Sequence, residues 1–292
     1  MSESIRDIVA AELAEPVDPR VAEMAAAVAA AHPAAARAVL FYGSCLREKQ
    51  LEGLMLDFYL IVSDYRTAYD RRWLATANRL IPPNVFPFAH RGLSAKYAVL
   101  SEADFGRECS VEAHSVSVWA RFAQPARLVW TADEAARARA VEAVSEAAPT
   151  LFALARPTLP RERRDEPLAV FREGFRLTYG AEIRAERKNR PGSIVEAEPE
   201  RYRRLGAAVL AQARAPVEVP GSWRRRQRKG KALTVLRLAK ASFTFAGGVD
   251  YLAWKISRHS GVPIEIRPWQ RRWPLLAAVT LLPRLLKRGA IR

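Results

Sequence analysis

The sequence predicts an α/β protein in which a mixed-sheet domain is followed by a mostly helical domain and a C-terminal amphipathic helix. Three observations lead to this expectation. Apolar, strand-like runs alternate with helical segments up to about residue 131, and only helical patterns follow. Half of the 292 residues are hydrophobic and 27% are charged, which excludes a disordered chain. We therefore expect three units, covering residues 1–131, 132–260 and 261–292.

The first unit alternates helices with short apolar runs bounded by turn residues, as α/β sheets do. The predicted elements are a helix at 19–31, strands at 38–42 and 54–63, a helix at about 65–79, a proline-rich loop through Pro82, Pro83 and Pro87, and a strand at 96–100.

The second unit has only helical patterns, separated by proline and glycine. Helices are predicted at about 132–147, 166–187, 198–213, 228–246 and 249–259, with breaks at Pro149, Pro157 to Pro160, 190–192 and 216–221.

Positive charge is concentrated in the second half of the chain. The net charge is +16 overall, but residues 1–150 hold 16 Lys/Arg against 19 Asp/Glu, and residues 151–292 hold 31 against 12. Such a basic region is expected to meet an anionic partner, either a nucleic acid or an anionic membrane.

The last segment favours the membrane. A mostly apolar segment of about 14 residues, Pro274 to Pro283 continued by Leu285 and Leu286, follows Trp269 and Trp273 and has Arg or Lys on both sides. As a helix it would reach only about 21 Å, so it is expected to lie on a bilayer and not to cross it. The alternative is a core helix with a solvated basic tail. We expect a peripheral membrane protein at the cytoplasmic face, or the matrix face in a mitochondrion, with no nucleic-acid partner.

A Gly-Ser turn followed by a carboxylate in the next strand is the most informative local pattern. Gly43 and Ser44 end the first predicted strand, and Asp57 lies in the middle of the second. Such a turn lets backbone N–H groups approach phosphates, while a strand carboxylate can hold Mg²⁺. A carboxylate in an apolar strand is costly without a metal or a cation, so Asp57 is predicted to have one.

This pattern indicates a nucleotidyltransferase-type sheet domain, with two positions left open. The second carboxylate usual in that superfamily is absent, because Tyr59 stands there; Asp64, Glu102 and Asp104 are possible substitutes. Lys96 opens the third strand, either as a phosphate ligand or as a surface lysine at a strand end.

The motifs Phe41-Tyr-Gly-Ser44, Met55-Leu-Asp-Phe58 and Lys96-Tyr97 with Ala98 to Ser101 resemble the mitochondrial-type phosphatidate cytidylyltransferases. These are the translocator-assembly-and-maintenance type of CDP-diacylglycerol synthase, and they too lack the second strand carboxylate. Weaker similarity continues around Arg121, around Arg184 and over 242–255.

The resemblance implies an Mg²⁺-dependent enzyme that transfers CMP from CTP to phosphatidic acid. It implies catalytic roles for Asp57 and Lys96, with Asp57 also the metal ligand, and nucleotide binding by the residues Tyr42, Gly43, Ser44, Arg121 and Arg184. Two alternatives stay open: a nucleotidyltransferase with an RNA or protein acceptor, and a non-catalytic basic module that binds membranes or nucleic acids.

Overall fold

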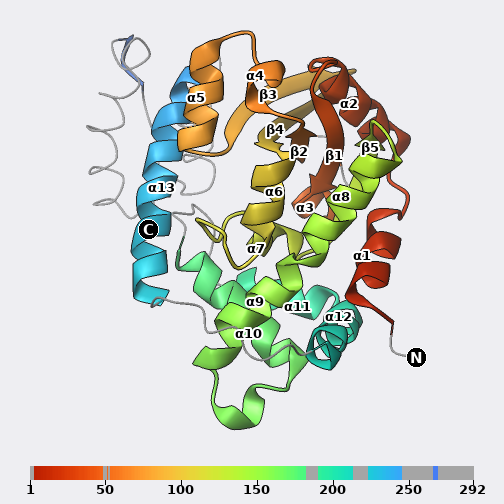
Figure 1. Ribbon diagram of the computed structural model, residues 1–292, viewed down its shortest axis with the longest axis vertical. Coiled ribbons are helices and arrows are strands. Elements are labelled where there is room, and N and C mark those ends of the chain that lie inside the picture. Colours follow the sequence, from red (N-terminus) through yellow and green to blue (C-terminus); the bar gives the residue numbers. More distant parts are fainter. Residues whose placement is uncertain are drawn as a thin grey trace.

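The computed structural model describes residues 3–48, 51, 53–181, 190–212, 223–244 and 266–268, which form an α/β protein around a five-strand mixed sheet (Figure 1). The strand order is β3-β4-β2-β1-β5, and β2 and β4 are parallel while every other neighbouring pair is antiparallel. The strands are β1 (Ala36–Tyr42), β2 (Met55–Val62), β3 (Asn84–His90), β4 (Leu93–Ser101) and β5 (Ala126–Thr131). The predicted α/β class is confirmed.

Helices cover both faces of the sheet. Those described are α1 (Ile5–Leu13), α2 (Pro19–Ala30), α3 (Ser44–Glu48), α4 (Tyr65–Ala68), α5 (Arg72–Leu80), α6 (Glu102–Cys109), α7 (Trp119–Phe122), α8 (Glu134–Ser145), α9 (Ala147–Ala155), α10 (Pro167–Tyr179), α11 (Arg190–Ala197), α12 (Pro199–Ala211) and α13 (Trp223–Thr244), with 3-10 turns at Arg156–Thr158 and Arg161–Arg163.

The alternation of side chains along each strand divides the core into two layers. On one face, residues such as Val39, Phe58 and Val99 pack with α2, α4 and α5. On the other face, residues such as Leu40 and Tyr59 pack with α1 and with the helices from α6 to α12. The predicted boundary at residue 131 stays a prediction, and described residues on both sides of it share this second cluster.

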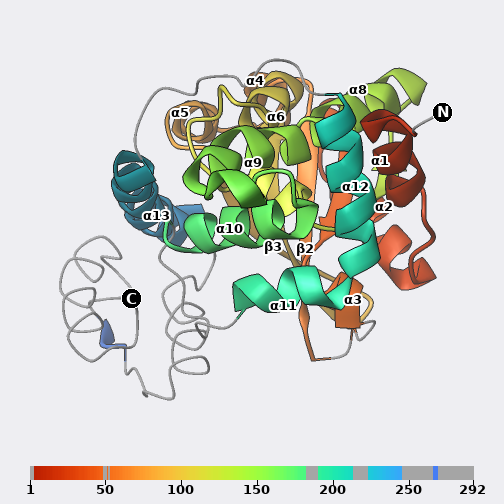
Figure 2. The same ribbon diagram turned by 90° about the horizontal axis from the view of Figure 1, so that it is seen from below.

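Helix α13 lies on the opposite side of the molecule from α1 and α12 and runs beside α5 (Figures 1 and 2). Its last turns are attached to the segment that follows α5. Arg237 Nε donates to the carbonyl of Pro82 at 2.7 Å, and Lys240 Nζ donates to that of Pro83 at 2.8 Å and to that of Ile81. These bonds place the basic helix against the sheet domain.

Two strands lie where the sequence analysis expected none. The prediction of a proline-rich loop was wrong in part, because residues from Asn84 onward form β3, an edge strand that contains Pro87. An edge strand tolerates proline, since the missing N–H can face away from the sheet. The other edge strand, β5, was not predicted either. Its six residues have mixed polarity, which does not distinguish a strand from a loop, and the chain is a strand there because it pairs with β1.

The helix predicted at 65–79 is two helices. The chain is extended at Tyr69, and the Tyr69 ring packs 5.9 Å from that of Phe86 in the core. Burial of this ring therefore interrupts the helix. The break expected at Pro149 falls at Glu146, between α8 and α9, and Pro149 itself lies in the first turn of α9, where proline is tolerated.

None of the helices in the described part of the chain is long and apolar enough to cross a membrane. The amphipathic helix expected within 261–292 and the helix expected at 249–259 fall outside the described residues, apart from 266–268.

Candidate active site

Three predicted residues lie side by side on adjacent strands, at one end of the sheet. Asp57 on β2 is in register with Tyr42 on β1 and with Lys96 on β4. Residues in register point to the same face, so these three side chains share a surface. The Lys96 ammonium lies 2.7 Å from Asp57 Oδ1, and the two side chains are 24% and 21% exposed. Lys96 is thus the cation that a carboxylate in an apolar strand requires.

This contact is an ion pair and not a well-aligned hydrogen bond. Asp57 Oδ1 has no accessible surface and accepts no hydrogen bond from the described residues, although the ammonium is close. Lys96 therefore balances the charge of the carboxylate, and a ligand can reach Oδ1 only if Lys96 moves away.

Gly43 brings the backbone against this carboxylate. Its φ is +97°, a conformation that other residues adopt only with strain, and an added Cβ would lie 3.2 Å from Asp57 Oδ2. Both features favour glycine here. The turn ends β1 beside Asp57, and Ser44 directly after it begins α3.

Tyr42 and Arg121 extend the site along the same face. The Arg121 guanidinium donates to the Tyr42 hydroxyl, although the two residues belong to β1 and α7. Burial raises the pKa of Tyr42 well above its ordinary value, and the negative charge of Asp57 raises it further. Tyr42 is therefore a neutral hydroxyl beside two charged groups.

Arg237 supports Arg121 from α13. It donates to Ser117 Oγ at 2.6 Å and to Ser115 Oγ at 3.1 Å, while the backbone carbonyl of Ser117 accepts a hydrogen bond from Arg121. The basic helix is thus joined to the site through one loop. Sequence reasoning missed Arg237 and Ser117, because no local pattern distinguishes them from other arginines and serines.

The other candidates of the sequence analysis do not join this cluster. Asp64 caps α4 by accepting from the backbone N–H groups of Arg66 and Thr67. Glu102 pairs with two arginines, and Asp104 accepts a 2.5 Å hydrogen bond from a tyrosine hydroxyl. All three follow the far ends of β2 and β4, so they do not replace the missing second carboxylate. Arg184 lies outside the described residues.

Asp57 is the carboxylate of this cluster that could hold the predicted Mg²⁺. No group of three or more His, Cys, Asp or Glu side chains suited to a metal occurs among the described residues. Mg²⁺ is commonly held by one or two carboxylates, with substrate phosphates and water completing its shell. A single carboxylate therefore fits Mg²⁺ that arrives with a nucleotide, and Asp57 is the residue that would hold it.

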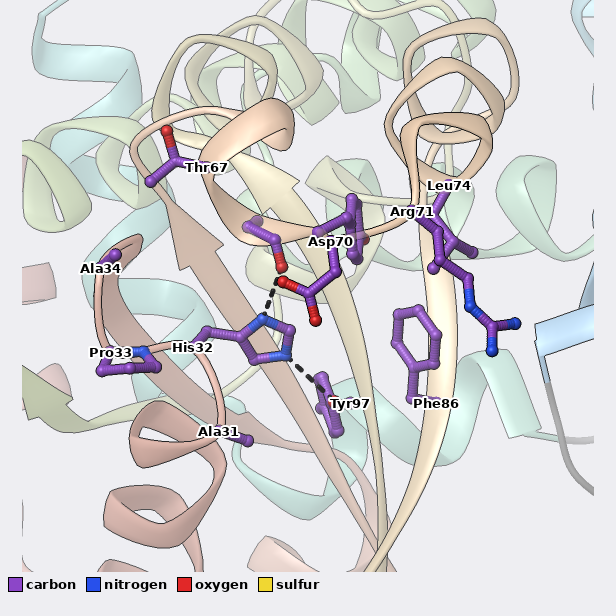
Figure 3. Close-up of a pocket in the computed structure, with 12 residues that line it drawn as sticks. Ala31, His32, Pro33, Ala34, Thr67, Asp70, Arg71, Leu74, Phe86 and Tyr97 are labelled. Carbon is purple, nitrogen blue, oxygen red and sulfur yellow. Dashed lines mark hydrogen bonds between the residues drawn. The ribbon is translucent and has the colours of Figure 1, made fainter.

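A cavity of about 400 Å³ lies on the other face of the sheet (Figure 3). Tyr97 lines it and follows Lys96 in β4, so its ring points away from Asp57. His32 crosses the cavity between the carbonyl of Ala68, 3.0 Å from Nδ1, and the Tyr97 hydroxyl, 3.1 Å from Nε2. A carbonyl only accepts, so Nδ1 donates and Nε2 accepts. Burial lowers the pKa of His32, which agrees with this neutral form.

No family model matches the chain, and no curated protein sequence matches it. Function is therefore argued from the cluster of Tyr42, Gly43, Asp57, Lys96 and Arg121.

Proposed function

We propose that the protein transfers CMP from CTP to phosphatidic acid at a membrane surface, giving CDP-diacylglycerol and pyrophosphate. One observation carries the proposal. The Gly43 turn packs against the Asp57 carboxylate, and Lys96 from the next strand lies 2.7 Å from the same group. A glycine turn, a carboxylate for Mg²⁺ and a cation for phosphate are thereby combined within three strands.

The residues have distinct roles in this proposal. Gly43 and Ser44 bind the CTP phosphates through the backbone N–H groups of the turn and through the serine hydroxyl, which can donate. Asp57 holds Mg²⁺, which when bound neutralises charge on the triphosphate. Lys96 exchanges its contact with Asp57 for a phosphate oxygen as the nucleotide binds. Tyr42 and Arg121 orient the nucleotide by hydrogen bonding and charge.

The reaction depends on alignment of the two substrates more than on covalent catalysis by the protein. A phosphate oxygen of phosphatidic acid forms a bond to the α-phosphorus of CTP, and the bond from that phosphorus to the pyrophosphate oxygen breaks. The attacking oxygen is already ionised at neutral pH. The protein therefore needs to hold the two substrates in line and to stabilise the negative charge that the pyrophosphate carries away.

The test is incubation of the purified chain with radiolabelled CTP, Mg²⁺ and mixed micelles of phosphatidic acid, scored for a labelled lipid. The expected result is a labelled lipid that requires all three components and is lost in Asp57→Asn. Arg137→Gln on α8 is a matched control, since Arg137 is an exposed cation paired with Glu134 away from the site. Absence of the labelled lipid, with CTP bound and unconverted, would reject the proposal.

A nucleotidyltransferase with an RNA or protein acceptor uses the same site residues. Replacing the micelles with RNA or with a protein mixture in the same assay separates these functions. Transfer of label to either acceptor, and not to lipid, would keep the chemistry and change the substrate.

A further inference from the structure

Two neighbouring helices carry the apolar side chains that the described structure leaves on its surface. The exposed large hydrophobic residues in the described part of the chain are Trp73 and Leu80 on α5, 44% and 73% exposed, and Leu236 on α13, 48% exposed. Clustering of such residues on adjacent elements marks an interaction surface, whereas single exposed ones need no explanation.

The outer face of α5 is amphipathic. Arg72, Trp73, Thr76, Arg79 and Leu80 are all exposed, and their spacing of three, four and seven residues places them on one side of the helix. The buried side of the same helix carries Ala75 and Asn78. Asn78 donates to the carbonyl of Val99 on β4 at 2.9 Å, so α5 is held firmly to the sheet while this face looks outward.

Helix α13 carries further positive charge in its first half, which lies beside the end of α10. Arg224, Arg228, Lys229 and Lys231 are exposed, and neither residues 72–80 nor residues 223–244 contain an acidic residue. Arg237 donates a hydrogen bond to the carbonyl of Pro82, two residues after Leu80. The second half of α13, which includes Leu236, therefore lies near the end of α5 (Figures 1 and 2).

We propose that this α5–α13 surface, made of Trp73, Leu80 and Leu236 with Arg72 and Arg79, docks on an anionic phospholipid membrane. Tryptophan sits at headgroup depth, leucines enter the acyl boundary, and the cations meet lipid phosphate. A second copy of the chain is a poor occupant, because two such basic faces repel each other. A nucleic acid is also a poor occupant, because it offers no apolar surface to bury the leucines.

The proposal rests on the proposed function for its biological meaning, since that function needs the chain at a lipid surface. Helix α5 packs on the face of the sheet opposite Asp57 and Lys96, so the surface reaches the site through α13 and not directly. It also identifies a membrane contact in addition to the one predicted within 261–292. Arg237 belongs to α13 and also supports the Arg121 loop, so docking of this surface bears directly on the helix that contacts the site.

The first experiment measures sedimentation of the full chain with vesicles of neutral or anionic phospholipid. Trp73→Ser with Leu80→Ser is expected to weaken binding to anionic vesicles at least tenfold at low and high salt. Arg72→Gln with Arg79→Gln is expected to weaken it about 25-fold at low salt, about fivefold per cation, and far less at high salt. The charge-matched control, Arg137→Gln with Arg203→Gln, removes two exposed cations from α8 and α12 on the other side of the molecule.

The second experiment places a polarity-sensitive dye on the surface through Leu80→Cys. Both native cysteines, Cys45 and Cys109, are buried, so the dye attaches selectively. Its emission is expected to rise and shift to the blue with anionic vesicles, while a dye attached through Arg137→Cys is expected to stay unchanged. A response to RNA, or to protein concentration without lipid, would overturn the membrane assignment. Equal losses of vesicle binding in the control pair would also overturn it.

Failure of this proposal and failure of the proposed function are distinguishable. Conversion of CTP with a short-chain, water-soluble phosphatidic acid needs no docking, so it is expected to be unchanged in the Trp73→Ser with Leu80→Ser variant. Wild-type vesicle binding by this variant rejects the docking surface alone. Absence of conversion in the wild-type chain rejects the proposed function alone.

Discussion

Replacing Gly43 with alanine tests whether the turn and the Asp57 carboxylate form one unit. The substitution has two separable effects. Alanine at a φ of +97° is strained, which costs about 1–3 kcal/mol, and its Cβ would lie 3.2 Å from Asp57 Oδ2. The carboxylate must then move by a few tenths of an ångström, against the ion pair that Lys96 makes at 2.7 Å.

Gly92 is the matched control for the backbone effect. Its φ is +78°, and an added Cβ there would meet nothing within 4 Å. We expect Gly92→Ala to lower the free energy of unfolding by about 1–2 kcal/mol through strain alone. Gly43→Ala is expected to lower it by about 1 kcal/mol more, since crowding in a packed site adds to the strain.

Urea unfolding of Gly43→Ala, Gly92→Ala, Asp57→Ala and the double variant Gly43→Ala with Asp57→Ala measures these effects. The double variant removes the crowded carboxylate, so a coupling of about 1 kcal/mol between the two sites is expected. In the labelled-lipid assay, Gly43→Ala is expected to convert CTP about tenfold more slowly, because small displacements of a reacting group reduce rates steeply. Equal stabilities of Gly43→Ala and Gly92→Ala, with no coupling, would refute the reasoning.

Four further outcomes are expected. Asp57→Asn abolishes labelled-lipid formation but lowers the free energy of unfolding by no more than about 1 kcal/mol, because the pair with Lys96 is partly exposed; turnover at the wild-type rate would contradict the metal assignment. Ser44→Ala raises the CTP concentration needed for half-maximal rate by about five- to thirtyfold if one hydroxyl contact is lost, and an unchanged CTP dependence would return Ser44 to a turn residue. Arg237→Gln lowers kcat with little change in vesicle binding, Arg237→Lys restores part of it, and equal kcat in the two variants would show that Arg237 does not position the loop. Burial lowers the pKa of Lys240 to about 7, so between about pH 7 and 10 the unfolded chain holds a proton that the folded chain lacks. The free energy of unfolding of the wild-type chain, relative to that of Lys240→Met, is therefore expected to rise by about 1.4 kcal/mol per pH unit in this range, and relative to that of the exposed control Lys231→Met it is expected to show no such trend. A difference from Lys240→Met that does not change with pH would contradict the shift.

Much of the sheet could be predicted from local patterns. The strands around 38–42, 54–63 and 96–100 are apolar runs bounded by turn residues, and each has a counterpart in β1, β2 and β4. The Gly-Ser turn and Asp57 could also be singled out, because both residue types are unusual at those places. The edge strands β3 and β5 could not be predicted, since pairing and not composition makes them strands.

The candidate site divides in the same way. Its members Gly43, Asp57 and Lys96 could be chosen from residue type and spacing, but the sequence left open whether Lys96 is a surface lysine. That depends on the parallel pairing of β2 with β4, which brings residues 39 positions apart into register. A metal or a cation beside Asp57 was expected, and the strand pairing identified Lys96 as a cation there.

The sequence by itself determined the α/β class, the separation of charge along the chain and the chemistry available at the Gly-Ser turn, because these depend on residue type and local spacing. Only the tertiary structure decided which residues meet. It placed Lys96 on Asp57, joined Arg237 to the Arg121 loop through Ser117, and set Trp73, Leu80 and Leu236 on adjacent helices. The physical reason is that such contacts join elements distant in sequence, and packing of the whole core selects them over other pairings.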